Sequence, residues 1–441
     1  MASTYLQRTL GTPTSEKIWT FSAWVKRSGL SSTQHIFSLD SGSNRDAFSF
    51  DSDNGLRFYC NGSATGYADL STNRVLKDTA AWYHLVLAVD TSQGTAADRV
   101  KLYINGTQYT WDETTTYPSQ DYLTFTDSGD IFRIGRDRTD ANYFDGLMSH
   151  VHFCDGTQLA PTVFGSTDST TGEWKINTSP SFTPGNNGFT VLKDGNTITD
   201  QSANSNDFSL GGGTLTQTED CPSNNFCTLN GNTQYSGTMS NGNLKIVQSG
   251  YNYNDRGTLG MESGKFYWEL KISNTHGEFG VCENGKAPQT DPQSGVGCYF
   301  LYNNGNTTGY IFNNVSSGSS STITCTAFAS GMIINVAYDA DNQALYLGQN
   351  GTWLNSGDPT SGASKTGAVI TNLYARYGGT IVPFIGHGTS SFTGTTEANF
   401  GNGYFGTTAI SSEGTNASGI GKFEYDVPTG YTALSTKGLN E

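Results

Sequence analysis

Residues 334–353 read INVAYDADNQALYLGQNGTW, and residues 87–111 read LAVDTSQGTAADRVKLYINGTQYTW. Each stretch begins with apolar residues that end in an acid, continues through a polar turn, and resumes as an alternating run that contains Leu345 or Leu102. Alternation places every second side chain of such a run on one face. The pattern therefore predicts the same β-hairpin twice in one chain.

An Asn-Gly pair follows each alternating run, at residues 105–106 and 350–351. Asn and Gly accept the positive φ angles that a two-residue hairpin turn requires, so a second hairpin is expected after the first in both halves. Any large antiparallel protein contains such hairpins. The segments around the two phrases must therefore decide whether the halves are related folds.

The composition bounds the fold class. A chain of 441 residues suggests two or three domains. Glycine accounts for 54 residues and charged residues for only 14% of the chain, which is typical of a turn-rich, weakly charged protein. Aromatic residues make up 12% and supply large buried groups that a disordered chain lacks. We therefore predict a well-folded all-β protein.

The charge excludes two classes of partner. The formal net charge is −15, with only 24 Lys and Arg residues, so clustered positive charge for nucleic acid is not expected. No apolar run approaches the roughly 18 residues of a spanning helix, so membrane insertion is not expected either.

The N-terminal sequence MASTYLQRTLGTPTSEKIW does not read as a Sec-type signal peptide. The sequence predicts a product that stays in the cytosol in which it is made.

The seven cysteines form no CxxC pairs and no dense disulfide framework. Most are expected to be small buried apolar residues. Only Cys221 and Cys227, six residues apart in an irregular stretch, are close enough in the sequence to suggest a pair. The sequence leaves open whether they form a disulfide.

Two stretches carry residue types that bind metals. His150 and His152 would share one strand face and could hold a metal, although a packed strand with polar rims is the favoured interpretation. Four residues with side-chain oxygens that could bind calcium lie close together in one loop, namely Asp137, Asp140, Asn142 and Asp145. Residues of these types are also common in turns, and an ordinary turn is the favoured interpretation. We predict no metal and no cofactor.

Catalytic motifs are missing from the sequence. The nearest phosphate-loop match, GVCENGKA at 280–287, has Ala287 where a Ser or Thr would hold magnesium, and Pro288 follows it. No G-x-S-x-G elbow and no H-E-x-x-H motif occurs. A glycosidase needs two facing carboxylates, and no short acidic cluster on an apolar strand suggests them. We predict no catalytic residues and no enzyme activity.

The chain divides into three parts. Residues 1–166 are strand-like segments separated by polar turns, and residues 231–441 resume that pattern. Residues 167–230 are rich in Gly, Ser, Thr and Asn and predict a connector with one closing strand at residues 189–192. No segment has a sustained 3.6-residue apolar period. The sequence therefore predicts two β-sandwiches joined by an irregular linker.

The first part resembles the laminin-G-like form of the concanavalin A-like lectin/glucanase superfamily. The resemblance spans roughly 150 residues and rests on five segments: WTFSAWVKR (19–27), AWYHLVLAVD (81–90), KLYINGTQ (101–108), FRIGR (132–136) and FDGLMSHVHFCDG (144–156). In that family such segments mark successive strands of a jelly roll. The resemblance implies a concanavalin A-like jelly-roll sandwich for residues 1–166.

The last part resembles the SPRY family. The matching segments, in the family's order, are SGKFYWELKI (263–272), FGVC (279–282), GYIFNN (309–314), residues 334–353, IVPFIG (381–386) and EANFG (397–401). SPRY domains are themselves concanavalin A-like sandwiches. The phrase that occurs twice is thus interpreted as the equivalent hairpin of two related folds.

A further resemblance concerns the whole arrangement. The bridge DCPSNNFCTLN (220–230), the SPRY-like half and the ending at residues 419–441 look like the standalone two-sandwich proteins of tailed bacteriophages. Those proteins are virion or tail-fibre-like components. The resemblance implies localisation in the virion, assembled in the host cytoplasm, and other virion proteins as partners.

Two function classes follow from these resemblances. The first is a fibre or adhesin that binds host-surface glycan or protein through sandwich loops; the second is a capsid-decorating or tail-joining structural protein without a host ligand. A glycan depolymerase is third. Aromatic platforms with polar neighbours are typical of carbohydrate sites. Two stretches offer such residues, which are Tyr109, Trp111, Tyr117, Tyr122, Tyr299, Tyr302, Asn303, Asn304 and Tyr310.

The oligomeric state is not encoded in a recognisable motif. No coiled-coil heptad or repeat that would force trimers occurs, so symmetry would have to come from sandwich faces. A homo-oligomer, with a trimer favoured, is the expectation for a fibre-like component.

Overall fold

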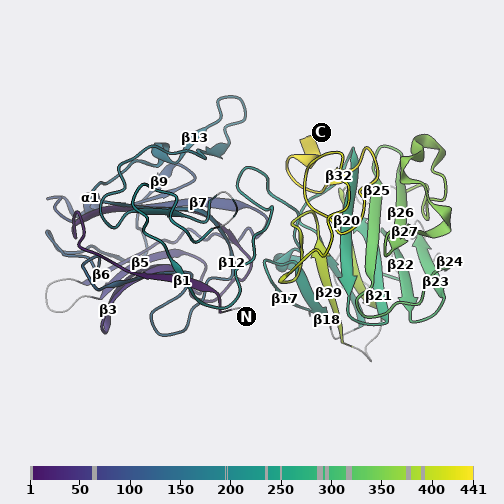
Figure 1. The fold of residues 1–441 in the computed structure, drawn as a ribbon, viewed down its shortest axis with the longest axis horizontal. Coiled ribbons are helices and arrows are strands. Elements are labelled where there is room, and N and C mark those ends of the chain that lie inside the picture. The colour runs from purple at the N-terminus through teal and green to yellow at the C-terminus, as the bar shows by residue number, and fades with distance from the viewer. Residues whose placement is uncertain are drawn as a thin grey trace. The chain divides into compact units, whose positions relative to one another are not determined.

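The computed structural model of the chain describes residues 3–61, 67–193, 195, 197–233, 237–248, 251–285, 292–293, 297–313, 320–373, 379–388 and 393–440. It divides into two compact units, Met1–Gln217 (unit 1) and Thr218–Glu441 (unit 2). Both are all-β, as predicted, and each is a sandwich of two main sheets (Figure 1).

Among the described residues, unit 1 contains an eight-stranded and a six-stranded antiparallel sheet and a small hairpin. The elements of the eight-stranded sheet are β1 (Tyr5–Thr9), β3 (Gln34–Ser41), β4 (Asn44–Phe50), β5 (Leu56–Asn61), β6 (Tyr67–Ser71), β10 (Thr115–Thr116), β11 (Ile131–Ile134) and β16 (Ser209–Gly212). Those of the six-stranded sheet are β2 (Ile18–Arg27), β7 (Trp82–Asp90), β8 (Val100–Ile104), β9 (Thr107–Tyr109), β12 (Gly146–Asp155) and β15 (Phe189–Val191). The remaining elements are α1 (Ala96–Arg99), η1 (Pro161–Val163) and the β13–β14 hairpin (Gly165–Thr167 and Trp174–Ile176).

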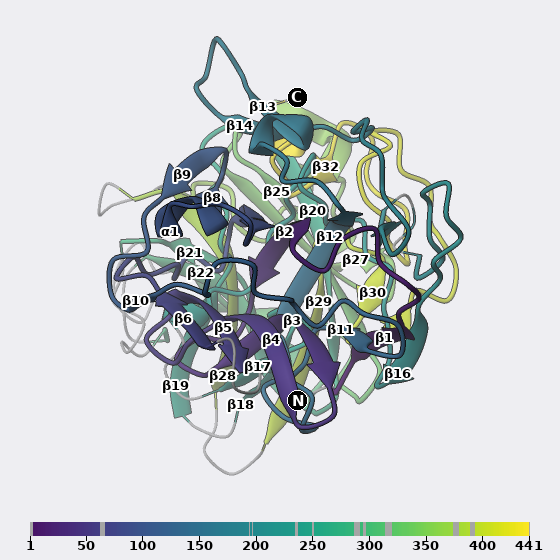
Figure 2. The same ribbon diagram turned by 90° about the vertical axis from the view of Figure 1, so that its left-hand side faces the viewer.

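Figure 2 shows the eight-stranded sheet in the order β10-β6-β5-β4-β3-β11-β1-β16. Its inner face carries large apolar side chains such as Phe37, Phe48 and Phe58, which are fully buried against Trp19 and Phe21 of the six-stranded sheet. Because side chains alternate along a strand, the residues between these positions point to the opposite, outer face. The core of unit 1 therefore uses the inner face of this sheet, and the side chains of the outer face are available for another function.

The repeated phrase forms the predicted hairpin in both units. In unit 1, β7 pairs with β8 and Leu87 lies opposite Leu102. In unit 2, β25 (Ile333–Asp339) pairs with β26 (Ala344–Gln349) and Val336 lies opposite Leu347. All four side chains are buried in the core of their own unit.

The Asn-Gly pairs make the predicted second turns. Asn105 and Gly106 have φ angles of 47° and 76°, and Asn350 and Gly351 have φ angles of 48° and 79°. Each pair joins two directly bonded strands, β8 to β9 in unit 1 and β26 to β27 (Thr352–Trp353) in unit 2. Both central residues have positive φ, which is the type I′ geometry that Asn-Gly favours.

The segment expected to be a connector contributes strands to unit 1. The predicted closing strand is confirmed as β15, whose Phe189 lies opposite Phe153 of β12. Further along, β16 pairs with β1, so that unit 1 extends to Gln217 rather than to residue 166. Phe189 and Phe208 are buried in the core, and their burial explains why this polar segment packs onto the sandwich.

Unit 2 contains, in its described part, a sheet of eight strands and a sheet of six. The first consists of β17 (Thr238–Ser240), β18 (Lys245–Gln248), β29 (Gly394–Asn399), β20 (Lys265–Ile272), β25, β26 and β27, with β32 (Thr432–Ala433) paired to β20. The second consists of β19 (Tyr251–Arg256), β28 (Ile381–Gly388), β21 (His276–Glu283), β22 (Cys298–Asn304), β23 (Thr308–Asn313) and β24 (Ser320–Thr324). The short elements are η2 (Gly231–Thr233), η3 (Leu354–Ser356), η4 (Pro359–Ser364), β30 (Tyr404–Phe405), β31 (Thr408–Ala409) and η5 (Gly438–Asn440).

The cysteines and the helices add two findings. None of the seven cysteines, all within the described ranges, forms a disulfide, so Cys221 and Cys227 are not paired in this structure. None of the helices in the described ranges has the length and hydropathy needed to cross a membrane.

Candidate functional site

The first predicted aromatic stretch is mainly core packing. Trp111 is 3% exposed and donates its indole N–H to a backbone carbonyl of β8 at 3.0 Å. Tyr122 is 4% exposed and donates its hydroxyl to the Asp46 carboxylate at 3.0 Å. Tyr109 and Tyr117 are half-buried and pack against the same core. Trp111 and Tyr122 therefore cannot form the expected ligand platform, because their rings face inward.

The second predicted stretch is divided between the two faces of its sheet. Tyr299 and Asn303 are fully buried in unit 2, so neither can contact a ligand. Asn304 is half-buried, and its side-chain oxygen accepts a hydrogen bond within its own turn. Tyr302 and Tyr310 lie directly opposite each other on β22 and β23, with ring centroids 6.1 Å apart. Only this last pair brings two predicted site residues together.

In both sequence stretches with metal-binding residue types, the side chains interact with other groups of the protein. Asp137 forms an ion pair with Arg45, and Asp140 forms one with Arg136. The described part of the chain contains no group of three His, Cys, Asp or Glu residues arranged to hold a metal ion. The carboxylates of this loop instead neutralise arginines.

The two histidines of β12 are also engaged by neighbouring hydroxyls. The pairing of β12 with β2 is interrupted by a β-bulge between Ser149 and His152, and the rings of His150 and His152 are neighbours with centroids 6.4 Å apart. The Nδ1 atom of His150 lies 2.7 Å from the Ser149 hydroxyl, and that of His152 lies 3.0 Å from the Thr190 hydroxyl. These contacts are those of a packed polar strand.

A cleft that the sequence did not predict lies on the outer face of the eight-stranded sheet of unit 1. It has a volume of about 270 Å³ and is built mainly from β3, β4 and β5, whose arrangement is visible in Figure 2. We call it the β3–β5 cleft, and its lining residues are Thr33, His35, Arg45, Ser49, Asp51, Arg57, Tyr59 and Asn142.

Strand alternation brings these residues together. Ser49 lies opposite Arg57, and Ala47 lies opposite Tyr59, all on the outer face of β4 and β5. A register shift between His35 and Phe37 marks a β-bulge in β3, the kind of irregularity that re-aims a side chain near a functional site.

The arginines of the cleft are already paired with carboxylates. Arg57 makes two parallel hydrogen bonds to Asp69 of β6, both 2.7 Å long, and lies 3.7 Å from Asp51. Arg45 pairs with Asp137 from the loop after β11. These contacts fix the two guanidiniums in place before any ligand arrives.

Aromatic side chains border the arginines. The guanidinium carbons of Arg57 and Arg45 lie 5.0 Å and 5.8 Å from the centre of the Tyr59 ring. Tyr67 packs edge-on against Tyr59, with centroids 5.7 Å apart, and is itself 52% exposed. An accessible aromatic ring thus stands beside a rigid set of polar groups.

His35 is the unusual member of the cleft. Its side chain is 4% exposed, yet its Nδ1 atom has no hydrogen-bond partner among the residues that the structure describes. Burial lowers the pKa of His35 to about 4, with Asp137 opposing this effect and Arg45 and Arg57 adding to it, so the imidazole is neutral at neutral pH. A buried polar atom without a partner is costly.

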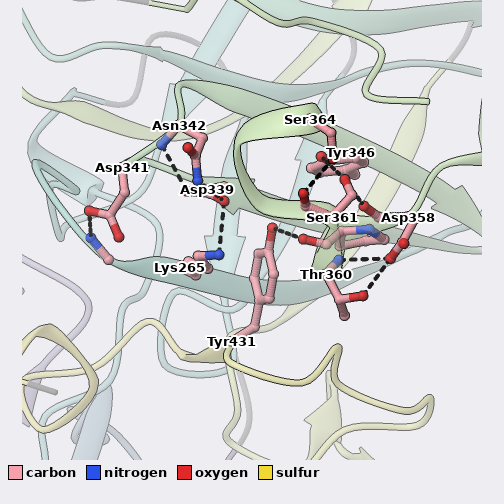
Figure 3. Close-up of polar contacts among 12 residues, drawn as sticks. Lys265, Asp339, Asp341, Asn342, Tyr346, Asp358, Thr360, Ser361, Ser364 and Tyr431 are labelled. Carbon is pink, nitrogen blue, oxygen red and sulfur yellow. Dashed lines mark hydrogen bonds and ion pairs between the residues drawn. The ribbon is translucent and has the colours of Figure 1, made fainter. Parts of the chain in front are cut away.

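The outer face of the larger sheet in unit 2 carries a different polar cluster, drawn in Figure 3. Its groups bond to one another: the Lys265 ammonium lies 3.1 Å from the buried Asp339 carboxylate, and the Tyr431 hydroxyl donates to the Pro359 carbonyl at 3.1 Å. The Tyr346 hydroxyl lies 3.2 Å from a hydroxyl of η4. This cluster holds η4 against the sheet and has a structural role.

The comparisons with known proteins agree with a lectin-like fold. Residues 2–163 match the family described as the concanavalin A-like lectin/glucanases superfamily. No curated protein sequence matches the chain.

Several solved structures are similar at low identity. The SPRY domain of human HERC1 is 14% identical, with 38% of this chain and 96% of that chain covered and a TM-score of 0.30. Domains LG4-5 of the mouse laminin alpha1 chain are 10% identical, with 96% and 92% covered and a TM-score of 0.29. Domain 4 of AbnA, an arabinanase from Geobacillus stearothermophilus, is 22% identical, with 33% and 64% covered and a TM-score of 0.26.

The fold and the cleft define a lectin-like β-sandwich protein, compatible with binding a carbohydrate or a protein. Laminin-G-like folds are typically non-catalytic.

Proposed function

We propose that the protein is a fibre or adhesin of a bacteriophage virion that binds a carbohydrate of the host surface through the β3–β5 cleft. The observation that carries the proposal is the buried His35, which lines a cleft with two fixed arginines and whose Nδ1 atom has no hydrogen-bond partner among the described residues. Preorganised polar groups beside an accessible aromatic ring are what recognition of a hydroxyl-rich ligand requires. The match of residues 2–163 to a lectin superfamily supports the same ligand class.

The setting in the virion rests on the resemblance of the two-sandwich arrangement to bacteriophage proteins. In this setting the protein assembles in the host cytoplasm, contacts other virion proteins and forms a homo-oligomer, for which we favour a trimer. Immunogold labelling of intact particles tests the location: gold at fibres or tail supports the proposal, whereas particles without label contradict it.

Binding of the purified full-length protein to host cells tests the ligand. We expect Tyr67→Ala to weaken binding without lowering the melting temperature, because the Tyr67 ring is mostly exposed. The matched variant is Tyr310→Ala, which removes an exposed tyrosine from unit 2. Loss of binding with Tyr310→Ala alone would move the site to the Tyr302–Tyr310 pair. Protein that neither binds cells nor competes with virus adsorption would favour a structural role in the capsid or tail.

A further inference from the structure

The charges around the β3–β5 cleft restrict the ligand that it can take, and this inference rests on the proposed carbohydrate binding. The positive groups are Arg45 and Arg57, and the negative groups that face them are Asp51, Asp69 and Asp137. Because His35 is neutral, the charged side chains at the cleft are two positive and three negative ones. The cleft as a whole does not attract an anion.

Arg57 also lacks a free Nε–Nη2 fork for an acidic group. Recognition of a ligand carboxylate or sulfate by arginine usually uses two parallel N–H groups of one guanidinium. In Arg57 the Nε and Nη2 groups both donate to Asp69. An acidic ligand would have to displace Asp69 and leave a protein carboxylate unpaired.

Asp51 adds a specific barrier to acidic ligands. Its carboxylate lines the cleft and lies 3.7 Å from Arg57, the single ion pair that the structure gives it within the described residues. Burial raises the pKa of Asp51, with Arg57 acting in the opposite direction. A ligand hydroxyl can donate a hydrogen bond to this carboxylate, whereas a ligand carboxylate placed there would be repelled.

A hydroxyl group also fits His35 better than an acid does. In a neutral imidazole one ring nitrogen donates and the other accepts. A hydroxyl both donates and accepts, so it satisfies the Nδ1 atom of His35 in either tautomer, whereas a carboxylate satisfies only one. The hydroxyl groups of Thr33, Ser49 and Tyr59 belong to residues of the same lining and offer further partners of this kind.

We infer that the β3–β5 cleft selects an uncharged saccharide, held through hydroxyl groups by His35 and the carboxylate-paired arginines, and that Asp51 excludes acidic saccharides. A cleft of about 270 Å³ accommodates a single sugar unit, so one residue of a longer glycan would occupy it. Neighbouring units of the glycan would then extend past Tyr67.

The test is binding of the full-length protein to an array of neutral oligosaccharides, built from hexoses and N-acetylhexosamines, and acidic ones that carry uronic acid, sialic acid or sulfate. Hits are titrated with wild type and Asp51→Asn. We expect wild type to bind neutral saccharides, and Asp51→Asn to shift the preference toward acidic ones by roughly tenfold, as removal of one nearby like charge predicts.

His35 is tested by two variants. His35→Leu removes the ring nitrogens at similar bulk and should lower the affinity for the neutral hit at least tenfold. His35→Asn places an amide near the position of Nδ1 and should retain much more of the affinity. The melting temperature of each variant reports folding separately from binding.

The outcomes separate the inference from the proposed function. Preferential binding of acidic saccharides that is lost in His35→Leu would overturn the inference and leave carbohydrate binding standing. An array on which no saccharide of either class binds would overturn both. Binding of neutral saccharides that is equal in wild type, Asp51→Asn and His35→Leu would show that the cleft is not the site, and would overturn both as well.

Discussion

Arg57 of β5 and Asp69 of β6 are diagonal neighbours across the strand pair and form two parallel hydrogen bonds of 2.7 Å each. This arrangement fixes the guanidinium at one wall of the β3–β5 cleft. Lysine has a single ammonium and cannot reproduce the planar fork. We therefore expect Arg57→Lys to weaken saccharide binding several-fold. The partly exposed ion pair contributes only about 0.2–1 kcal/mol, so the melting temperature should change little. Isothermal titration calorimetry measures the affinity, and scanning calorimetry measures the melting temperature. An unchanged affinity would contradict the role of Arg57.

Leu345 and Leu102 each lie on the second strand of their hairpin, and both are fully buried. An aspartate at either position would place an unpaired carboxylate among apolar side chains, at a cost of several kcal/mol. We expect Leu345→Asp to unfold unit 2 and Leu102→Asp to unfold unit 1, while the other unit keeps its melting transition. Scanning calorimetry of the full chain distinguishes these results. A single variant that abolishes both transitions would show that the units do not fold separately.

Trp111 is a core residue of unit 1 and not a surface platform. Replacing a buried tryptophan by alanine costs about 3–5 kcal/mol, because apolar contacts are lost and a cavity remains. We expect Trp111→Ala to lower the free energy of unfolding of unit 1 by this amount, in a denaturant titration followed by far-UV circular dichroism. Tyr67→Ala serves as the exposed control and should change stability little. Equal stabilities of the two variants would contradict the buried position of Trp111.

Glu269 is fully buried in unit 2 and accepts four hydrogen bonds, from Tyr267, Asn399 and the backbone N–H groups of Glu424 and Tyr425. Burial raises its pKa to about 7, despite these hydrogen bonds. Between about pH 4.5 and 7 the folded state therefore holds a proton that the unfolded state releases. This group makes unit 2 less stable as the pH rises through that window.

The variant Glu269→Gln tests this dependence. Its free energy of unfolding should vary less with pH between 4.5 and 7 than that of the wild type, in denaturant titrations at several pH values. Part of the slope should remain, because burial also raises the pKa of Asp255 in the same unit to about 6. Identical slopes in wild type and Glu269→Gln would show that Glu269 titrates normally.

Cys282 and Cys298 lie directly opposite each other on β21 and β22, are buried and form no disulfide. The next pair of residues is hydrogen-bonded, with the N–H of Glu283 donating to the carbonyl of Gly297 at 2.9 Å. Pairs alternate along an antiparallel ladder, so the cysteines form a non-hydrogen-bonded pair with Cα atoms about 4.5 Å apart. That spacing is within the range of disulfides.

We expect refolding with oxidised glutathione to join Cys282 to Cys298. The two thiols are oxidised to the disulfide and one glutathione disulfide is reduced to two glutathiones. Closing this loop should stabilise unit 2 by about 3 kcal/mol. Peptide mapping without reductant identifies the bond, and Cys298→Ser is the control that cannot form it. Refolded protein in which both thiols still react with alkylating reagent would contradict the prediction.

The fold was largely predictable because its signals are local. Alternating runs and Asn-Gly pairs depend only on neighbouring residues, and they correctly placed the hairpins that contain Leu102 and Leu345. The extent of unit 1 was less predictable, because β16 has the polar, glycine-rich sequence of a linker. Its pairing with β1 joins segments about 200 residues apart.

The candidate site could not be read from the sequence in the same way. Tyrosine and tryptophan are common both in cores and in carbohydrate sites, so composition did not separate the inward-facing Trp111 from an exposed ring such as Tyr67. The lining of the cleft comes from three strands, in which His35, Arg45 and Arg57 alternate with core aromatics. Each of these residues resembles an ordinary solvent-facing strand position.

The sequence by itself determined the all-β class, the two related hairpins and their Asn-Gly turns, because alternation and positive φ angles are properties of adjacent residues. Only the tertiary structure decided which faces are covered. It paired Arg57 with Asp69 and buried His35, whose Nδ1 atom has no hydrogen-bond partner within the described ranges. Such contacts depend on strand order and on a bulge in β3, which bring distant residues together and are not encoded at any single position.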